Sequence, residues 1–124
     1  MLQYIRRTKS DIMSGVDKEG LIKSKLVARN TVKLLYRHGI YIIRVHHTNI
    51  ILHIPYKEAY ELYSGGYHTK LTRKRINEFS PANIIQEKGK WYVLQSDGEM
   101  IPFYEGIAVC ANGDILNTIN RRGK

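Results

Sequence analysis

The chain has a single cysteine and no long apolar run, and each shortage excludes a class of protein. Cys110 alone cannot form a disulfide within the chain, and its place in the apolar run 107–111 predicts a small buried side chain, not a reactive thiol. The most apolar stretch, residues 40–54, contains an arginine and three histidines, which excludes a membrane span. The first residues lack the apolar core of a signal peptide, so we expect a cytoplasmic protein.

Internal repeats, low-complexity tracts and proline-rich linkers are also missing. A length of 124 residues fits one domain, and 43% apolar with 25% charged residues is ordinary for a globular chain. The first 30 residues have the least regular pattern, with glycines and mixed charge between residues 10 and 20. We therefore predict a basic N-terminal arm over residues 1–30, an α+β domain over residues 31–120 and a basic tail over residues 121–124.

Positive charge is abundant and unevenly distributed. The formal net charge is +9, and residues 1–53 hold ten lysines and arginines against three acidic residues. Residues 54–120, by contrast, hold seven against eight. This asymmetry indicates an anionic partner, either nucleic acid or the acidic surface of another protein. A basic domain without such a partner is the remaining alternative.

Alternating and β-branched patterns predict strands through most of the chain. Glycine-containing turns separate them, and a short helix should begin at Thr69 or Thr72, where threonine can act as N-cap, and end at Phe79 before Ser80-Pro81. Residues 21–27 fit a strand or a short helix, and residues 58–63 fit a strand or a helical turn. The result is an α+β fold, a mostly antiparallel sheet with one short helix after a Gly-Gly turn. The predicted strands are 31–37, 40–45, 48–54, a hairpin within 84–95, 101–103 and 107–110.

The segment from Ser64 to Phe79 carries the strongest functional signal. On a helix, three cations and an amide at positions 70, 73, 74 and 77 share one face, while Thr72, Ile76 and Phe79 share the other. The two glycines before the helix permit close approach to its positive end. The pattern indicates a phosphate or carboxylate contact surface, with a solvated helix face as the alternative. The candidate contact residues are Gly65, Gly66, Tyr67, Lys70, Arg73, Lys74, Arg75, which lies at the boundary of the face, and Asn77.

The same segment belongs to a wider pattern that resembles a family of small phage and prophage proteins. Four elements carry the resemblance, over roughly residues 44–109, and Leu71 stands where the pattern usually has threonine. The resemblance implies a phage-type origin and no particular activity. The elements are His46-His47-Thr48-Asn49-Ile50, the run from Ser64-Gly65-Gly66-Tyr67 to Arg75-Ile76-Asn77, Trp91-Tyr92-Val93, and Pro102-Phe103-Tyr104-Glu105-Gly106.

Spacings typical of catalytic or metal sites are not found. The five histidines form no convincing pair one helical turn apart, and Ser64 lacks the surroundings of a nucleophile elbow. Phosphate-loop and dinucleotide fingerprints are missing as well. We therefore expect no enzymatic activity, no cofactor and no metal.

Nine tyrosines and one tryptophan are interspersed with cations, as in Tyr36-Arg37 and Lys90-Trp91. Such rings could stack unpaired bases on a basic sheet, or they could fill the core and cover sheet edges. The first hypothesis is a phage accessory protein that binds nucleic acid without strong sequence preference. The alternatives are an inhibitor of a host enzyme or defence complex, and a virion component that forms a homo-oligomer.

Overall fold

The structure is a computed structural model, and it describes residues 20–116. Its strands agree with the sequence prediction to within a residue or two, and the two ambiguous segments are both strands. The mostly antiparallel α+β fold with a short helix is therefore confirmed for these residues. The elements are β1 (Leu21–Ala28), β2 (Thr31–Tyr36), β3 (Tyr41–Val45), β4 (Thr48–Ile54), β5 (Ala59–Leu62), α2 (Lys70–Phe79), β6 (Ile84–Glu87), β7 (Lys90–Leu94), β8 (Met100–Pro102) and β9 (Ile107–Val109).

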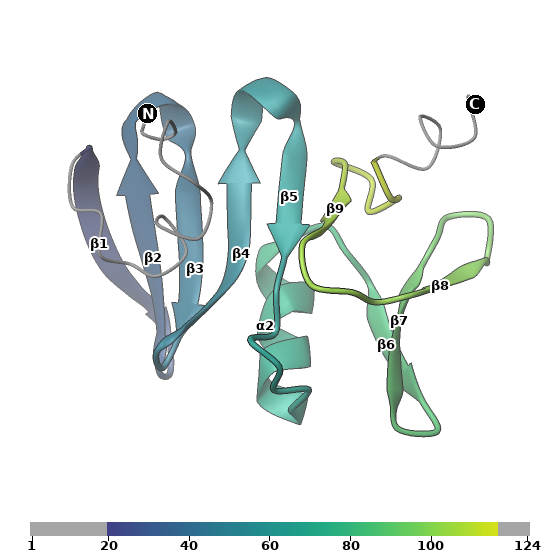
Figure 1. Cartoon of the computed structure of the whole chain (residues 1–124). Coiled ribbons are helices and arrows are strands. Elements are labelled where there is room, and N and C mark those ends of the chain that lie inside the picture. The colour runs from purple at the N-terminus through teal and green to yellow at the C-terminus, as the bar shows by residue number, and fades with distance from the viewer. Residues whose placement is uncertain (1–19, 117–124) are drawn as a thin grey trace.

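The strands form two antiparallel sheets. The larger sheet has six strands in the order β1-β2-β3-β4-β5-β9, and the smaller has three in the order β6-β7-β8. Strands β1 to β5 follow one another as neighbours, and β9 returns from the far end of the chain to pair with β5, with Ile107 opposite Leu62. Figure 1 shows β1 to β5 side by side and the smaller sheet beside them. Glu105 precedes β9, so this return brings it to the larger sheet.

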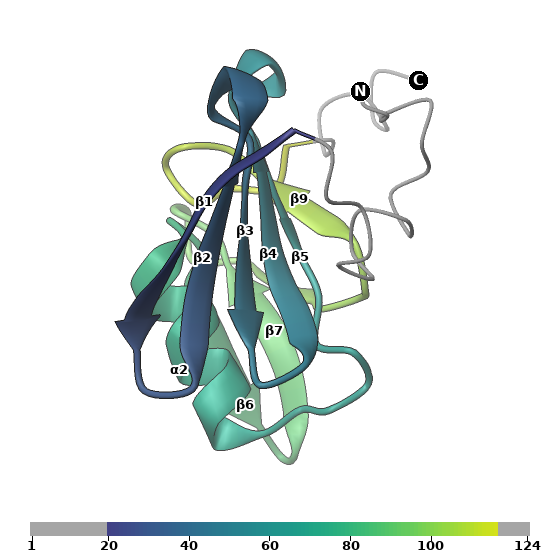
Figure 2. The same ribbon diagram turned by 90° about the vertical axis from the view of Figure 1, so that its left-hand side faces the viewer.

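Helix α2 connects the two sheets. The Thr69 hydroxyl accepts from the Thr72 N–H at 3.1 Å, which caps the first turn. At the other end, the Ser80 hydroxyl donates to the Ile76 carbonyl at 2.8 Å, and Pro81 follows. Figure 2 looks onto β1 and shows α2 on one side of the larger sheet.

The larger sheet has buried apolar side chains on both faces. On the face that packs against α2, here called the helix face, Ile43, Ile51 and Leu62 stand side by side and join Ile76 and Trp91 in the main core. On the opposite face, Leu34, Ile42, Leu52 and Ile54 form a second cluster. Strands buried on both faces read as continuous apolar runs, as 50–52 does.

The predicted boundary between the N-terminal arm and the α+β domain, at residue 30, lies too far along the chain. Strand β1 pairs with β2 along its length, with Lys25 opposite Lys33, so residues 21–28 are part of the sheet and not of an N-terminal arm. The weak pattern of this segment has a physical reason: β1 is an edge strand with an exposed surface, so its side chains do not alternate between core and solvent. Residues 1–19 and the tail 121–124 lie outside the described residues.

Candidate functional site

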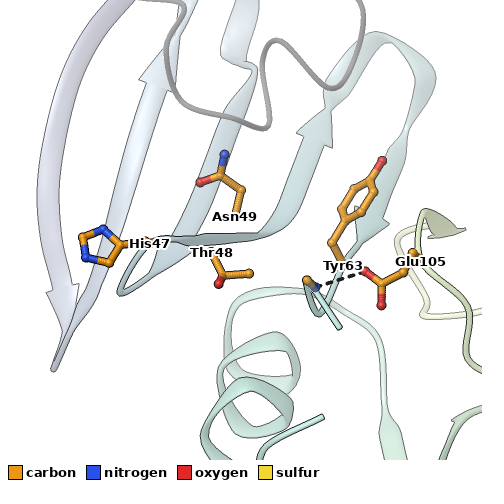
Figure 3. A pocket seen from close by; sticks show the side chains of 6 residues that line it. His47, Thr48, Asn49, Tyr63 and Glu105 are labelled. Carbon is orange, nitrogen blue, oxygen red and sulfur yellow. Dashed lines mark hydrogen bonds between the residues drawn. The ribbon is translucent and has the colours of Figure 1, made fainter. Parts of the chain in front are cut away.

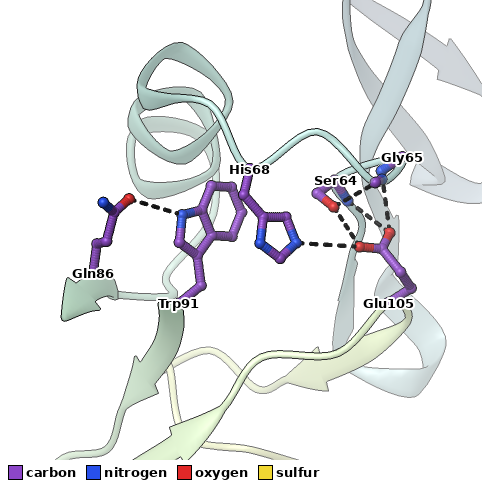
Figure 4. Close-up of polar contacts among 7 residues, drawn as sticks. Ser64, Gly65, His68, Gln86, Trp91 and Glu105 are labelled. Atoms are coloured by element: carbon purple, nitrogen blue, oxygen red, sulfur yellow. Dashed lines mark hydrogen bonds and ion pairs between the residues drawn. The ribbon is translucent and has the colours of Figure 1, made fainter. Parts of the chain in front are cut away.

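The Ser64-Gly65-Gly66 turn is held by the carboxylate of Glu105. One carboxylate oxygen accepts from the backbone N–H of Ser64 at 2.8 Å and of Gly65 at 3.1 Å, and the other accepts from the Ser64 hydroxyl (Figure 4). The Gly66 N–H donates to the Ser64 hydroxyl oxygen at 3.0 Å. The N–H of Gly65 therefore binds an internal carboxylate, and the N–H of Gly66 binds an internal hydroxyl. Both glycines are predicted contact residues, and their N–H groups have partners within the protein.

Gly65 also has a steric reason to be glycine. Its φ is +66°, and a Cβ at this position would stand 2.7 Å from the Thr48 Cγ2 atom. Carbon atoms do not approach that closely, so either the Thr48 side chain or the backbone would have to shift. The turn is therefore packed against the first residue of β4, which belongs to another element of the family pattern.

Three aromatic rings pack together beside the Glu105 carboxylate. The His68 ring lies 4.4 Å from the Trp91 ring, with 15° between their planes, and both meet Phe103 edge-on. His68 Nε2 lies 4.0 Å from a Glu105 carboxylate oxygen, and both side chains are more than one-third exposed. In Figure 4, His68 stands between Trp91 and Glu105. The four sequence elements of the resemblance thus meet at one place in the structure.

The predicted cationic face of α2 is divided by the fold. Lys70 and Lys74 are exposed, whereas Arg73 is half-buried and its Nε atom has no hydrogen-bond partner among residues 20–116. Tyr67, just before the helix, is 65% exposed. The exposed part of the predicted surface is therefore Tyr67, Lys70 and Lys74, together with Gly65 and Gly66, whose N–H groups already have internal partners.

Two other predicted contact residues have structural partners. Arg75 is buried, donating to the Thr31 hydroxyl at 2.9 Å, to Glu78 at 2.8 Å and to the Arg29 carbonyl at 3.4 Å. The Asn77 amide exchanges two hydrogen bonds with the backbone of Ile84, at 3.0 and 2.8 Å. A helical projection shows which side chains share a face of the helix, but it does not show which of them are covered by neighbouring strands. The β1–β2 turn covers Arg75, and the start of β6 engages Asn77.

A pocket of about 290 Å³ lies beside the glycine turn (Figure 3). Asn49, which lines it, is buried, and its side-chain oxygen accepts from Arg44 Nε at 2.5 Å. The Asn49 amide nitrogen and Arg44 Nη2 are buried without a partner among the residues described here. Two such donors favour an acceptor, such as a phosphate or carbonyl oxygen, in their vicinity. The pocket is lined by His47, Thr48, Asn49, Tyr63, Gly65 and Glu105.

Tyr63 lies in the same pocket wall. Its hydroxyl donates to Glu61 at 2.9 Å. Burial raises the pKa of the Tyr63 phenol far above its ordinary value, and the carboxylates of Glu61 and Glu105 raise it further. The phenol is therefore a neutral donor at all physiological pH values.

The rings of the helix face stack on one another. Tyr41, His53 and Tyr60 are in register on three adjacent strands, with ring centroids 4.9 and 4.0 Å apart. The Lys33 ammonium lies 4.3 Å from the Tyr41 ring centroid. Burial raises the pKa of Tyr41 to about 12 and, with Lys33 adding to the effect, lowers that of His53. The His53 ring therefore lies between two tyrosine rings and is not open to a stacked base.

Sequence analysis did not identify Arg44, Asn49, His68 or Glu105 as site residues. Three of the four, Asn49, His68 and Glu105, stand inside the elements of the family resemblance, so the pattern itself was a usable signal. Arg44 carries no such signal, because a single arginine in a strand is indistinguishable from any exposed cation.

Across residues 20–116, no group of three or more His, Cys, Asp or Glu side chains is placed to hold a metal ion. In the same part of the chain, no helix is long and apolar enough to cross a membrane.

Comparison with known protein families identifies the class of protein to which the chain belongs. A family of phage proteins, described as Kyanoviridae Gp96 protein, has a model that matches residues 6–110 of the chain. The chain therefore belongs to the Kyanoviridae Gp96 protein family. The phage origin that the sequence resemblance implied is confirmed at this level. No curated protein and no solved structure matches the chain.

Proposed function

We propose that the protein binds nucleic acid through the exposed basic surface at the start of α2, without strong sequence preference, in the cytoplasm of the host cell. The surface consists of Tyr67, Lys70 and Lys74, flanked by Gly66. The proposal is for a binding protein without catalytic activity.

The observation that carries the proposal is the charge at the start of α2. Helices usually place acidic residues in the first turn, because the positive end of the helix dipole lies there. The first turn of α2 has no acidic residue, and Lys70 occupies its first position. Neither Lys70 nor Lys74 forms an ion pair with a described residue, although Glu78 lies on the same helix and pairs with Arg75. A bound phosphate would relieve the repulsion among these positive charges.

The chemistry of this surface favours backbone contacts. Lysine binds phosphate as a flexible point charge and carries little information about base identity. The exposed Tyr67 ring could stack on an unpaired base, and such stacking is also tolerant of sequence. The cations of the larger sheet would add long-range attraction, because no acidic residue occurs between positions 20 and 57.

The test is a salt titration of binding. Fluorescence anisotropy of labelled single- and double-stranded DNA and RNA should show log K falling linearly with log salt, by about 0.7 to 0.9 per phosphate neutralised. The Lys70→Ala/Lys74→Ala variant should bind all sequences more weakly and make the slope shallower by about 1 to 2. Lys88→Ala/Lys90→Ala, at the exposed β6–β7 turn, is the charge-matched control and should leave the slope near that of the parent.

Two results would contradict the proposal in different ways. An unchanged slope in the Lys70/Lys74 variant would move the contact surface away from α2. A parent protein that binds neither DNA nor RNA at low salt would end the nucleic-acid proposal altogether.

Two other functions fit a basic phage protein. One is inhibition of a host enzyme or defence complex through an acidic partner surface, and the other is a homo-oligomeric virion component. The first is favoured by a separate feature of the structure, strand β1.

A further inference from the structure

Strand β1 is an open edge of the larger sheet. It is the first strand in the sheet order and, among residues 20–116, it pairs with β2 alone. It has eight residues, more than any other strand described. In an antiparallel pair, half of the backbone N–H and C=O groups of an edge strand point away from its neighbour. Figure 1 shows β1 at the outer end of the sheet.

The apolar side chains of β1 are unusually exposed. Ile22 is 61% exposed and Leu26 is 69% exposed. Leu26 stands opposite Val32 on the face that carries the second apolar cluster, so it extends that cluster to the sheet edge. Natural edge strands are usually short or protected against further pairing. A long edge with large exposed apolar side chains instead marks a surface that another strand can cover.

The other face of β1 is cationic. Lys23 and Lys25 are exposed, and Lys25 stands opposite Lys33, so the three lysines lie together on the helix face. No acidic residue occurs between positions 20 and 57, so β1 to β4 supply no carboxylate to balance them. The pairing register shifts near both ends of β1, which leaves Lys23 to Leu26 as its regular stretch.

These features select the chemistry of the partner strand. Two copies of the chain paired through β1 would place lysines of one copy among lysines of the other, and like charges on facing strands are unfavourable. A strand with acidic residues on one face and apolar residues on the other would satisfy both faces of β1. We propose that β1 is a docking edge for an extended segment of a partner protein in which acidic and apolar residues alternate. This interaction does not depend on the nucleic-acid surface of α2.

The test uses synthetic peptides and the full chain. A labelled peptide of alternating glutamate and valine, about as long as β1, should bind in fluorescence anisotropy. A peptide of the same composition with the glutamates grouped at one end should bind about tenfold more weakly, because its charges cannot all face the lysines. A peptide of alternating lysine and valine should not bind the parent.

Charge reversal on β1 locates the site. Lys23→Glu/Lys25→Glu should weaken binding of the glutamate peptide about tenfold or more and create binding of the lysine peptide. Both side chains are exposed, so folding should be retained, which circular dichroism checks. Lys88→Glu/Lys90→Glu makes the same charge change in the smaller sheet and should alter affinity by less than about twofold.

Three outcomes would overturn the inference. The first is a parent chain that does not bind the glutamate peptide. The second is an equal loss of affinity in the β1 variant and the β6–β7 control, which would show that peptide binding depends on the net charge of the protein and not on β1. The third is a parent that sediments as a dimer and becomes monomeric on Ile22→Lys/Leu26→Lys substitution, which would make a second copy the occupant of β1.

Discussion

Glu105 and Ser64 are 41 positions apart in the sequence, and the carboxylate of the first binds both the backbone N–H and the hydroxyl of the second. Ser64 is fully buried, so the side chain of Glu105 is the acceptor that makes its burial tolerable. The interaction connects the start of β9 to the turn before α2. It also gives the Pro-Phe-Tyr-Glu-Gly element of the sequence a structural role.

Removal of this carboxylate should destabilise the fold. Glu105→Ala leaves buried donors without an acceptor, which costs about 2 to 3 kcal/mol, whereas Glu105→Gln keeps one carbonyl acceptor and should cost about 1 kcal/mol. Urea unfolding followed by Trp91 fluorescence measures both. Glu99→Ala, at an exposed turn, is the control and should change the free energy of unfolding by less than about 0.5 kcal/mol. Equal effects of Glu105→Ala and Glu99→Ala would show that the turn does not depend on the carboxylate.

The contact between Gly65 and Thr48 supplies a second prediction. Gly65→Ala adds a Cβ 2.7 Å from Thr48 Cγ2 to the strain of a positive φ, and we expect a loss of about 3 kcal/mol in unfolding free energy. Gly98→Ala has a positive φ with open space around it, so it should lose only about 1 kcal/mol. Thr48→Ser removes the Cγ2 methyl group that the new Cβ would contact.

The double variant Gly65→Ala/Thr48→Ser separates strain from contact. If the methyl group is the obstacle, the double variant should be more stable than Gly65→Ala alone, by about 1 kcal/mol or more. Additive losses in a thermodynamic cycle would mean that the backbone conformation, and not Thr48, demands glycine at position 65.

The fold was largely predictable and the site was not, for one physical reason. Local periodicity and turn chemistry determine individual strands, so β2, β3, β4 and α2 follow from the sequence within a residue or two. Long-range pairing has no local signature. The pairing of β9 with β5 brings Glu105 to Ser64, and the β1–β2 turn covers Arg75, and neither contact is encoded in spacing. Four of the predicted contact residues, Gly65, Gly66, Arg75 and Asn77, therefore form hydrogen bonds within the protein.

Arg75 should affect stability before it affects binding. Arg75→Ala removes hydrogen bonds to Thr31, to Glu78 and to the Arg29 carbonyl, and should lower the free energy of unfolding by about 2 kcal/mol. Its neighbour Lys74 is exposed, so Lys74→Ala should leave stability within about 0.5 kcal/mol of the parent. Chemical unfolding of the two variants decides between a structural role and a contact role. A stable Arg75→Ala protein with impaired nucleic-acid binding would restore Arg75 to the contact surface.

The ring stack on the helix face predicts a pH dependence of stability. Burial lowers the pKa of His53 below its ordinary value of 6.5, so the folded state holds this imidazole neutral where the unfolded chain already binds a proton. The unfolded state then binds more protons, and stability falls as the pH drops from about 6.5 towards the folded-state pKa. His53→Phe keeps a ring between Tyr41 and Tyr60 but cannot titrate. Its free energy of unfolding should therefore decline less than that of the parent between about pH 7.5 and 5.5. Parallel pH profiles for parent and variant would show that the His53 ring accepts a proton as easily in the stack as in water.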